Sequence, residues 1–381
     1  RPSTPAPDAA PVASTGGTTE VRTEDAASSP ATVTSQATSH ADDPLADLLA
    51  RARAGALDPD LRRRPWASAA LPEGALGLAT GPLRLAFVGP RRLAVAQFGG
   101  RQLAIGDVGR GGIEWDSRSL RGLGVFRSVA ASDAGVVVAL NRGLAVLDPD
   151  APDDVTTVLE GPNATEVAGA GTRVLWADDD GVWTIDLATE EAPRRLLPAP
   201  DAAFMRLVAL APGGRHGAVL ELERRSPAEL GARRSDLTLV TFAPGAAPRL
   251  EAAARPDPVK DVALADSGAC AAVGDMSLLE VWTPGRAGRQ LLYVEDRVFA
   301  PALVDVSFSP RGEFVYASSR NPGLAKELVA WRPGDRQARR VSRPGIEVAV
   351  YGVAVSPDGL LLALARAAGV VEVWVAGDDV E

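Results

Sequence analysis

One pattern recurs along most of this chain: a short apolar strand, a tight turn, a second apolar strand, another turn, and a third strand with an aromatic residue. The clearest copy is "VAVSPDGLLLALARAAGVVEVWVAG", residues 353–377. Similar copies occupy residues 304–335, 260–285 and 205–245, and three weaker copies precede them. One such unit cannot bury its hydrophobic face alone, so the pattern predicts a fold built from repeats stacked on one another.

The spacing of the copies indicates the kind of repeat. The aromatic residue of the third strand, or the residue that replaces it, falls at Gly106, Leu147, Ile185, Phe242, Trp282, Trp331 and Trp374. Successive positions are 41, 38, 57, 40, 49 and 43 residues apart, and most of these steps are near the roughly 40–45 residues of a four-stranded propeller blade. The long step contains an insertion, "ERRSPAELGARRSD", residues 223–236. Seven copies predict seven blades, with six or eight as the alternatives.

Each strand type has its own composition. The first strands, such as "LRLAF", "VDVSF" and "YGVAV", are short, β-branched and nearly all small or apolar, which is typical of strands that line a crowded central channel. Polar segments such as "APRRLLPAP" and "RQARRVSRP" follow the third strands, and we expect them to be the outermost strands. Turns of the S-P-D-G type supply a proline that presets φ and a glycine that tolerates positive φ.

Three pairs of motifs carry a resemblance to a known family: "VSPDGLLLALA" with "VEVWVAG", "FSPRGEFVYAS" with "LVAWRPG", and "VALADSGACAAVGD" with "EVWTPG". With these motifs, residues 66–381 resemble a seven-bladed WD-repeat-like β-propeller, although the strong matches are confined to the last three repeats. No repeat keeps the Gly-His pair of the family, and Trp-Asp is replaced by Trp-Thr-Pro, Trp-Arg-Pro or Trp-Val-Ala. The resemblance therefore implies the apolar core of the family without its buried His–Asp–Ser/Trp hydrogen-bond network.

The predicted fold class is all-β: four-stranded antiparallel blades in a closed ring. The last repeat supplies only three strands, ending near Val375, and "AGDDVE" follows. We expect its fourth strand to come from "WASAALPEGALGL", residues 66–78, because that pairing leaves no unpaired edge.

The region before the repeats differs in composition. Residues 1–43 are rich in Ala, Pro, Ser and Thr, which predicts a disordered tail or linker. In residues 44–65 we expect a short amphipathic helix and a hinge, since Asp43 is a suitable N-cap and Leu45, Leu48 and Leu49 share one face. This helix either packs on the neighbouring domain or docks into a groove of a partner.

Composition excludes several function classes. The formal net charge of −9 argues against general binding to a phosphate backbone, and no window approaches the roughly 18 consecutive apolar residues of a membrane span. Cys270 is the only cysteine, and His40 and His216 are the only histidines, so neither a thiolate cage nor a histidine-rich metal site is expected. No phosphate-binding loop or nucleophile elbow occurs. We therefore expect no cofactor, no metal and no catalysis.

Two acidic clusters are interpreted as turns. The run "WADDDGVW", with Asp178, Asp179 and Asp180, fits a D-G hairpin, and "LDPDAPDDV" (residues 147–155) fits a polar loop between strands. Neither has the spacing of a calcium loop.

Function is predicted at the level of class. The resemblance implies a non-catalytic interaction scaffold, or a docking and sensor module, that binds protein partners through propeller faces and loops. The alternative is a propeller that binds a ligand or metal, or catalyses a reaction, at the channel mouth, which would require carboxylates or histidines to converge there. A third hypothesis is that the propeller is the docking half of a larger polypeptide. The candidate partner-binding residues lie in the insertion and the helix: Arg224, Arg225, Glu229, Arg233, Arg234, Leu45, Leu48 and Leu49. For the insertion, the competing interpretation is a solvated hairpin with compensating charges.

Overall fold

A computed structural model describes most of residues 65–376. The described residues are 65–72, 83–120, 122–151, 155–189, 191–199, 204–223, 235–255, 259–274, 278–282, 289–293, 303–319, 328–333, 335, 339–340, 350–366 and 369–376. Within these ranges the regular structure consists of β-strands, and no helix there is long and apolar enough to cross a membrane. All of these strands lie in the compact unit Pro44–Glu381.

The strands form seven antiparallel sheets of four strands each. The innermost strands are β2 (Leu83–Phe87), β6 (Phe126–Ser132), β10 (Glu166–Ala170), β14 (Phe204–Leu210), β18 (Val259–Leu264), β22 (Leu303–Phe308) and β26 (Val350–Val355). The second strands are β3 (Arg92–Gln97), β7 (Gly135–Leu140), β11 (Arg173–Asp178), β15 (His216–Glu223), β19 (Cys270–Gly274), β23 (Val315–Ser319) and β27 (Leu361–Arg366). The third strands are β4 (Gln102–Gly109), β8 (Gly143–Leu147), β12 (Gly181–Asp186), β16 (Ser235–Thr241), β20 (Leu278–Trp282), β24 (Leu328–Trp331) and β28 (Val370–Val375). The outermost strands are β5 (Gly112–Ser119), β9 (Val155–Glu160), β13 (Arg194–Pro198), β17 (Arg249–Arg255), β21 (Arg289–Tyr293), β25 (Arg339–Arg340) and β1 (Ala67–Ala70).

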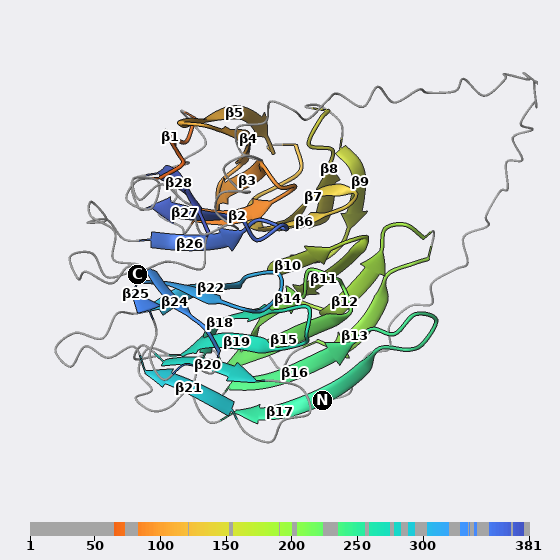
Figure 1. Cartoon of the computed structure of the whole chain (residues 1–381). Helices are drawn as coiled ribbons and strands as arrows, with labels where there is room; N and C mark the ends of the chain where they lie inside the picture. The colour runs from red at the N-terminus through yellow and green to blue at the C-terminus, as the bar shows by residue number, and fades with distance from the viewer. Residues whose placement is uncertain are drawn as a thin grey trace, which may run out of the picture. The chain divides into compact units, whose positions relative to one another are not determined.

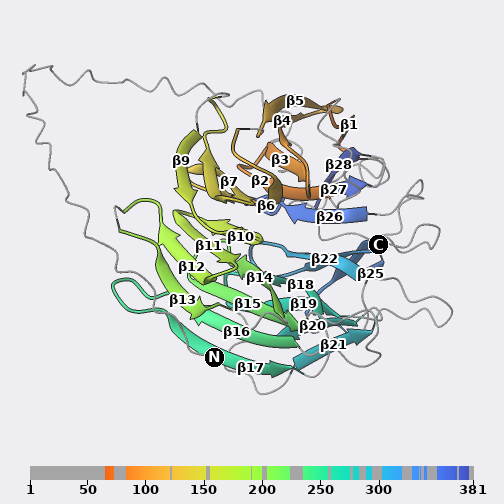
Figure 2. The same ribbon diagram turned by 180° about the vertical axis from the view of Figure 1, so that it is seen from behind.

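The seven sheets are the blades of a ring. Neighbouring blades contact through their innermost strands in the order β2, β6, β10, β14, β18, β22, β26 and back to β2. Outer strands such as β5, β9, β13 and β17 lie at the periphery (Figures 1 and 2). The prediction of seven four-stranded blades is therefore confirmed. The polar segments between repeats form outermost strands, as expected: β13 and β25 lie in the two that were quoted above.

The ring closes between the two ends of the propeller. β1 pairs with β28 in the register Ala67↔Val373 and completes the sheet β1-β28-β27-β26, as the red and blue strands in Figure 1 show. Trp66 is buried beside this strand, in one hydrophobic cluster with Leu83 and Phe87 of the first blade. The expected fourth strand of the last blade is confirmed, and it lies within residues 66–78.

The core lies between the blades, because each blade buries both faces against its neighbours. One cluster joins β18, β19 and β20 to the next blade through Val281, Phe308 and Trp331, and Trp331 is 1 % exposed. Cys270 is fully buried in the adjoining cluster, which agrees with its interpretation as a small core residue.

The first turn of each repeat follows the predicted chemistry. Ser309 Oγ accepts a hydrogen bond from Phe314 N at 2.9 Å, and Ser356 Oγ accepts one from Leu361 N at 2.9 Å. Gly312 and Gly359 have φ of 74° and 77°, a region that only glycine adopts without cost. The S-P-R-G and S-P-D-G sequences therefore each close a turn that a β-branched residue could not.

In the first blade the tryptophan lies on the outermost strand, β5, and not on the third strand, β4. Gly106 occupies the third-strand position that tryptophan holds in later repeats, and it pairs directly with Trp115 of β5. A Cβ on Gly106 would lie 2.5 Å from Trp115 Cε3. The glycine thus leaves the space that the indole of the outermost strand fills.

Some expectations fall outside the described residues. These are the tail of residues 1–43, the helix and hinge of residues 44–65 with Leu45, Leu48 and Leu49, and most of the insertion with Arg224, Arg225, Glu229, Arg233 and Arg234. They stay predictions.

Ring closure can be tested by deletion. Removing residues 66–80 takes away β1 and leaves β28 with an unpaired edge, so we expect the propeller to lose its cooperative thermal unfolding. Removing residues 1–43 is the matched deletion and is expected to leave Tm nearly unchanged, as measured by circular dichroism. A stable, soluble fragment of residues 81–381 would contradict this account.

The exchange between Gly106 and Trp115 can be tested by a double-mutant cycle. We expect Gly106→Ala to lower the free energy of unfolding by about 1–3 kcal/mol, the usual cost of overpacking a core. In a background that carries Ile113→Ala and Trp115→Ala the same substitution should cost less than half as much, because both clashing side chains are gone: Ile113 Cγ2 would lie 2.6 Å from the new Cβ. Gly161→Ala, where a Cβ meets no atom within 4 Å, is the control in chemical denaturation. Equal costs in both backgrounds would contradict the exchange.

Candidate functional site: the central channel

The innermost strands share a sequence pattern that places seven residues at one level of the channel. In each strand one residue is followed by Val or Leu and then by Ala or Ser. The residues at this level are Arg84, Ser128, Glu166, Leu207, Asp261, Asp305 and Gly352. Five of the seven are polar. We call Arg84, Ser128, Glu166, Asp261 and Asp305 the polar layer.

Local irregularity directs several of these side chains. The pairing register shifts just before Ser128, Asp261, Asp305 and Gly352. A bulge of this kind bends the strand and re-aims the following side chain. Three of the five members of the polar layer therefore follow a bulge, whereas Arg84 and Glu166 lie in regularly paired strands.

Two carboxylates of the layer satisfy backbone groups of the next blade. Asp261 Oδ2 accepts a hydrogen bond from Val306 N at 2.8 Å, and Asp305 Oδ2 accepts one from Val353 N at 2.7 Å. β22 and β26 are edge strands of their sheets, and buried N–H groups on such an edge need a partner. Each carboxylate thus links its own blade to the blade that follows.

Gly352 lies where the last blade approaches the first. A Cβ there would lie 3.0 Å from the carbonyl oxygen of Leu83, whereas its 3.5 Å distance to Asp305 Oδ2 would be an ordinary contact. The glycine therefore lets the last blade approach the first.

Arg84 is the cation of the polar layer. Its Nη2 lies 3.6 Å from Glu166 Oε2, and Ser128 donates a hydrogen bond to the other oxygen of Glu166. The pKa of Arg84 is raised, mainly by the charge of Glu166 and also by Asp305 and Asp261. One guanidinium therefore faces three carboxyl groups, and the layer is short of positive charge.

The pKa values of two carboxyl groups in the polar layer are raised. Burial raises the pKa of Asp261 well above its ordinary value, and so do the charge of Asp305 and a hydrogen bond between the two carboxyls. Burial also raises the pKa of Glu166, against the opposing effect of Arg84. Desolvation and like charge both disfavour the ionised form, so protons bind this layer more tightly than they bind exposed carboxylates.

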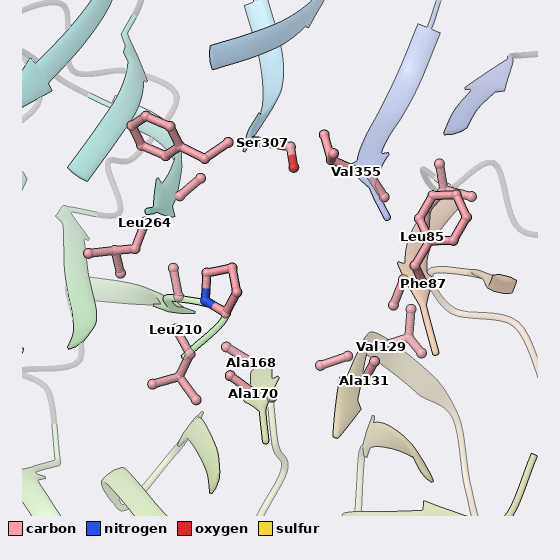
Figure 3. A pocket seen from close by; sticks show the side chains of 18 of the residues that line it. Leu85, Phe87, Val129, Ala131, Ala168, Ala170, Leu210, Leu264, Ser307 and Val355 are labelled. Atoms are coloured by element: carbon pink, nitrogen blue, oxygen red, sulfur yellow. The ribbon is translucent and has the colours of Figure 1, made fainter. Parts of the chain in front are cut away.

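A cavity of about 420 Å³ extends from the polar layer to the turns between first and second strands. All seven innermost strands contribute to its wall, as Figure 3 shows with Leu85, Val129, Ala168, Leu210, Leu264, Ser307 and Val355. At its open end lie Pro212, Pro310 and Pro357 from three of the turns. The channel therefore has a charged floor, a mostly apolar wall and a rim of turns.

The polar layer corrects one expectation from the sequence. The first strands were expected to be almost wholly apolar, yet five of the seven place a polar side chain in the channel. The physical reason is that the channel has open space, so polar groups pair across it or cap backbone N–H groups. Aligning the tripeptides that begin at Arg84, Glu166, Asp261 and Asp305 exposes the layer in the sequence.

The other singled-out residues lie away from this site. Asp178 caps the hairpin between β11 and β12: its Oδ1 accepts hydrogen bonds from Asp180 N and Gly181 N, both at 2.9 Å. It also accepts hydrogen bonds from the indoles of Trp176 and Trp183. Turn chemistry is therefore confirmed for this cluster.

The second acidic cluster is held by arginines. Arg118 Nη1 donates to the carbonyl oxygen of Asp148 at 2.5 Å, and Arg92 forms an ion pair with Asp150. His216, the one histidine in the described part of the chain, is half-buried at the start of β15. Among the described residues, no group of three or more His, Cys, Asp or Glu is arranged to hold a metal ion.

The tryptophan of the last repeat is held by charged side chains of its own blade. In the last blade, Glu372 Oε2 accepts hydrogen bonds from the indole of Trp374 at 3.0 Å and from Arg366 at 2.7 Å. Arg366 is buried, with 6 % of its side chain exposed. A charge-assisted pair thus anchors the tryptophan of this repeat.

Comparison with solved structures decides the fold. A chain of the solved structure "Crystal Structure of Mitotic Checkpoint Complex" aligns with a TM-score of 0.60 over 83 % of this chain and 93 % of that chain, at 14 % identity. The fold is a WD-repeat-like β-propeller. No protein-family model matches the sequence, and no curated protein matches it. Because 972 chains of solved structures match, the propeller fold by itself does not select one function.

The coupling of the two aspartates predicts a specific titration. Asp305→Asn removes the negative charge beside Asp261, so the pKa of Asp261 should fall towards its ordinary value. Wild-type stability linked to Asp261 is present below its unfolded pKa and is lost as the pH rises through its raised folded pKa. The variant should lose less stability over that window, by about 1.4 kcal/mol per unit of pKa removed.

Carboxyl ¹³C NMR titration and unfolding at several pH values measure both effects. Glu251→Gln, on the exposed face of β17, is the control and should leave the pKa of Asp261 unchanged. An unchanged Asp261 titration in Asp305→Asn would show that the two carboxyls are not coupled.

Proposed function

We propose that this chain is a non-catalytic interaction scaffold, or docking module, that binds a protein partner through the faces and loops of its propeller. The observation that carries the proposal is the closed ring of seven blades, in which every sheet is buried between neighbours. Such a ring holds its connecting loops on a rigid frame, and binding residues gather on loops of this kind. The similar chain named above comes from the structure of a complex, which also supports this class of function.

The insertion between β15 and β16 is the loop that we assign to the partner. Its two strands are paired up to Leu222↔Ser235. At the base of this hairpin, Arg206 donates from Nε and Nη2 to Glu221 Oε1 at 2.8 and 2.6 Å, and from Nη1 to the carbonyl oxygen of Pro198. Only 5 % of the Arg206 side chain is exposed. The insertion therefore starts from a fixed base.

The direction of the strands places this base. β15 begins at the turn after β14 and runs away from it, and its last residue, Glu223, pairs with Phe204 at the start of β14. The base of the insertion therefore lies at the end of the blade opposite the turns at the cavity rim. In this proposal Arg224, Arg225, Glu229, Arg233 and Arg234 contact an acidic or mixed-charge surface.

The helix predicted for residues 44–65 supplies the second proposed contact. Its apolar face, with Leu45, Leu48 and Leu49, suits a hydrophobic groove of the partner.

Charge reversal in the insertion tests the function. A photo-crosslinking residue at position 230 of the full chain identifies the partner in a host lysate, and Kd is then measured with that partner purified. Replacing Arg224, Arg225, Arg233 and Arg234 by Glu should weaken binding at least tenfold. Replacing Arg110, Arg194, Arg195 and Arg249, all at exposed positions away from the cavity lining, by Glu is the matched charge control and should leave Kd within about twofold. A wild-type chain with no saturable partner would overturn the scaffold function, and equal Kd values would remove the insertion from it.

A further inference from the structure

Small side chains form one level of the channel wall. Two residues after each member of the level that holds the polar layer, every innermost strand carries a small side chain. These residues, which we call the small belt, are Ala86, Ala130, Ala168, Ala209, Ala263, Ser307 and Ala354. All seven line the cavity. Ala130, Ala209 and Ala354 also pack in the hydrophobic clusters between blades, so the belt lets neighbouring innermost strands approach closely and adds little bulk to the cavity wall.

The floor of the cavity has acceptor capacity that the described protein groups do not use. Asp261 and Asp305 are each half-buried and line the cavity. Each uses Oδ2 for a backbone N–H of the next blade. The two carboxyls also share a hydrogen bond, so a bound cation replaces that contact and uses the lone pairs that remain. The floor is therefore open on its channel side.

The net charge of the polar layer indicates whether a ligand bound in the channel would be an anion or a cation. Three carboxyl groups face one guanidinium, so the floor is negative even when Asp261 carries a proton. An anion would meet like charge in a poorly solvated space, which is costly. A divalent metal lacks its ligands, because the described residues hold no group of three suitable side chains. A monovalent organic cation fits the charge.

The side chains of the channel wall and the carboxylate oxygens indicate which kind of organic cation would bind. Ala, Val, Leu and Phe side chains in the wall suit an aliphatic stem. A guanidinium fork binds best to both oxygens of one carboxylate, whereas an ammonium group is a compact charge with three donors. Because each aspartate already uses one oxygen, the pair suits the ammonium group.

We propose that the channel binds a lysine side chain of the protein partner, with its stem against the small belt and its ammonium group between Asp261 and Asp305. The lysine enters through the rim that carries Pro212, Pro310 and Pro357. This inference rests on the proposed scaffold function and adds a third contact, at the opposite end of the blades from the base of the insertion. The ammonium group replaces the proton that the two carboxyls hold between them.

Binding is therefore linked to pH. The pKa of Asp261 is raised, so below that pKa the unbound site holds a proton that binding must release. Affinity should increase as the pH rises through the pKa of Asp261. Glu166 and Arg84 share the floor and affect the same titration, and a lysine stays charged across this range.

The first experiment uses n-butylammonium chloride, which matches the lysine stem and charge, with the full chain. NMR follows the amide signals of Val306 and Val353, whose N–H groups bind the two aspartates. We expect saturable shifts with a Kd of roughly 1 mM, as suits a ligand of five non-hydrogen atoms. n-Butanol, the uncharged analogue, and NaCl at the same ionic strength should give none. Equal shifts with n-butanol would overturn the role of charge.

Two variants test the contributions of the carboxylates and of the channel wall to binding separately. Asp261→Asn with Asp305→Asn removes the charges and should weaken n-butylammonium binding at least tenfold. Ala168→Leu narrows the channel with the carboxyls intact and should do the same, so the test survives if the first variant folds poorly. Glu251→Gln and Ala188→Leu, both at exposed positions, are the matched controls. Binding that is unchanged in both channel variants would overturn the site.

The partner identified through the insertion supplies the last test. If a lysine of the partner occupies the channel, Ala168→Leu should weaken partner binding at least fivefold, while Ala188→Leu should not. Equal partner binding by Ala168→Leu and the wild type would overturn the lysine proposal, and a small diffusible amine would then be the occupant. That outcome leaves the scaffold function intact, because the base of the insertion is at the opposite end of the blade from the rim.

Discussion

Each blade of this propeller is an open sheet, and every open sheet has two edges that must be satisfied or protected. The outer edges face solvent, but the inner edges face a confined channel where an unpaired N–H is costly. Asp261 and Asp305 satisfy this constraint because each accepts a hydrogen bond from a backbone N–H of the next blade, that of Val306 and that of Val353 respectively. The same side chains bring negative charge into the channel. Blade-to-blade attachment and the chemistry of the channel therefore have one origin.

The ring adds a second constraint, since seven blades close only if the last finds its fourth strand. β1 supplies that strand from the other end of the propeller and pairs with β28. Trp66 joins the cluster that contains Leu83 of the first blade, so closure is hydrophobic as well as hydrogen-bonded. This arrangement makes the two faces of the ring rigid enough to present loops.

The structure also shows how a degenerate repeat keeps its fold. The last blade uses Arg366 and Glu372 to hold Trp374. The first blade has Gly106 at the third-strand position, and Trp115 of the outermost strand fills the space beside it. The two blades therefore keep the same arrangement of strands with different residue types. Sequence comparison with curated proteins finds no match, whereas comparison of structures finds the fold.

The sequence by itself determined the all-β class, the number of blades, the outermost strands, the turns and the closing strand, because each follows from local periodicity and turn chemistry. Only the tertiary structure decided what the first strands do at the axis. Arg84, Glu166, Asp261 and Asp305 are far apart along the chain, and each alone resembles an ordinary charged residue in a short strand. The ring brings them to one level, where burial and mutual charge raise the pKa values of Glu166 and Asp261. Those effects depend on distances between blades, which no single repeat contains.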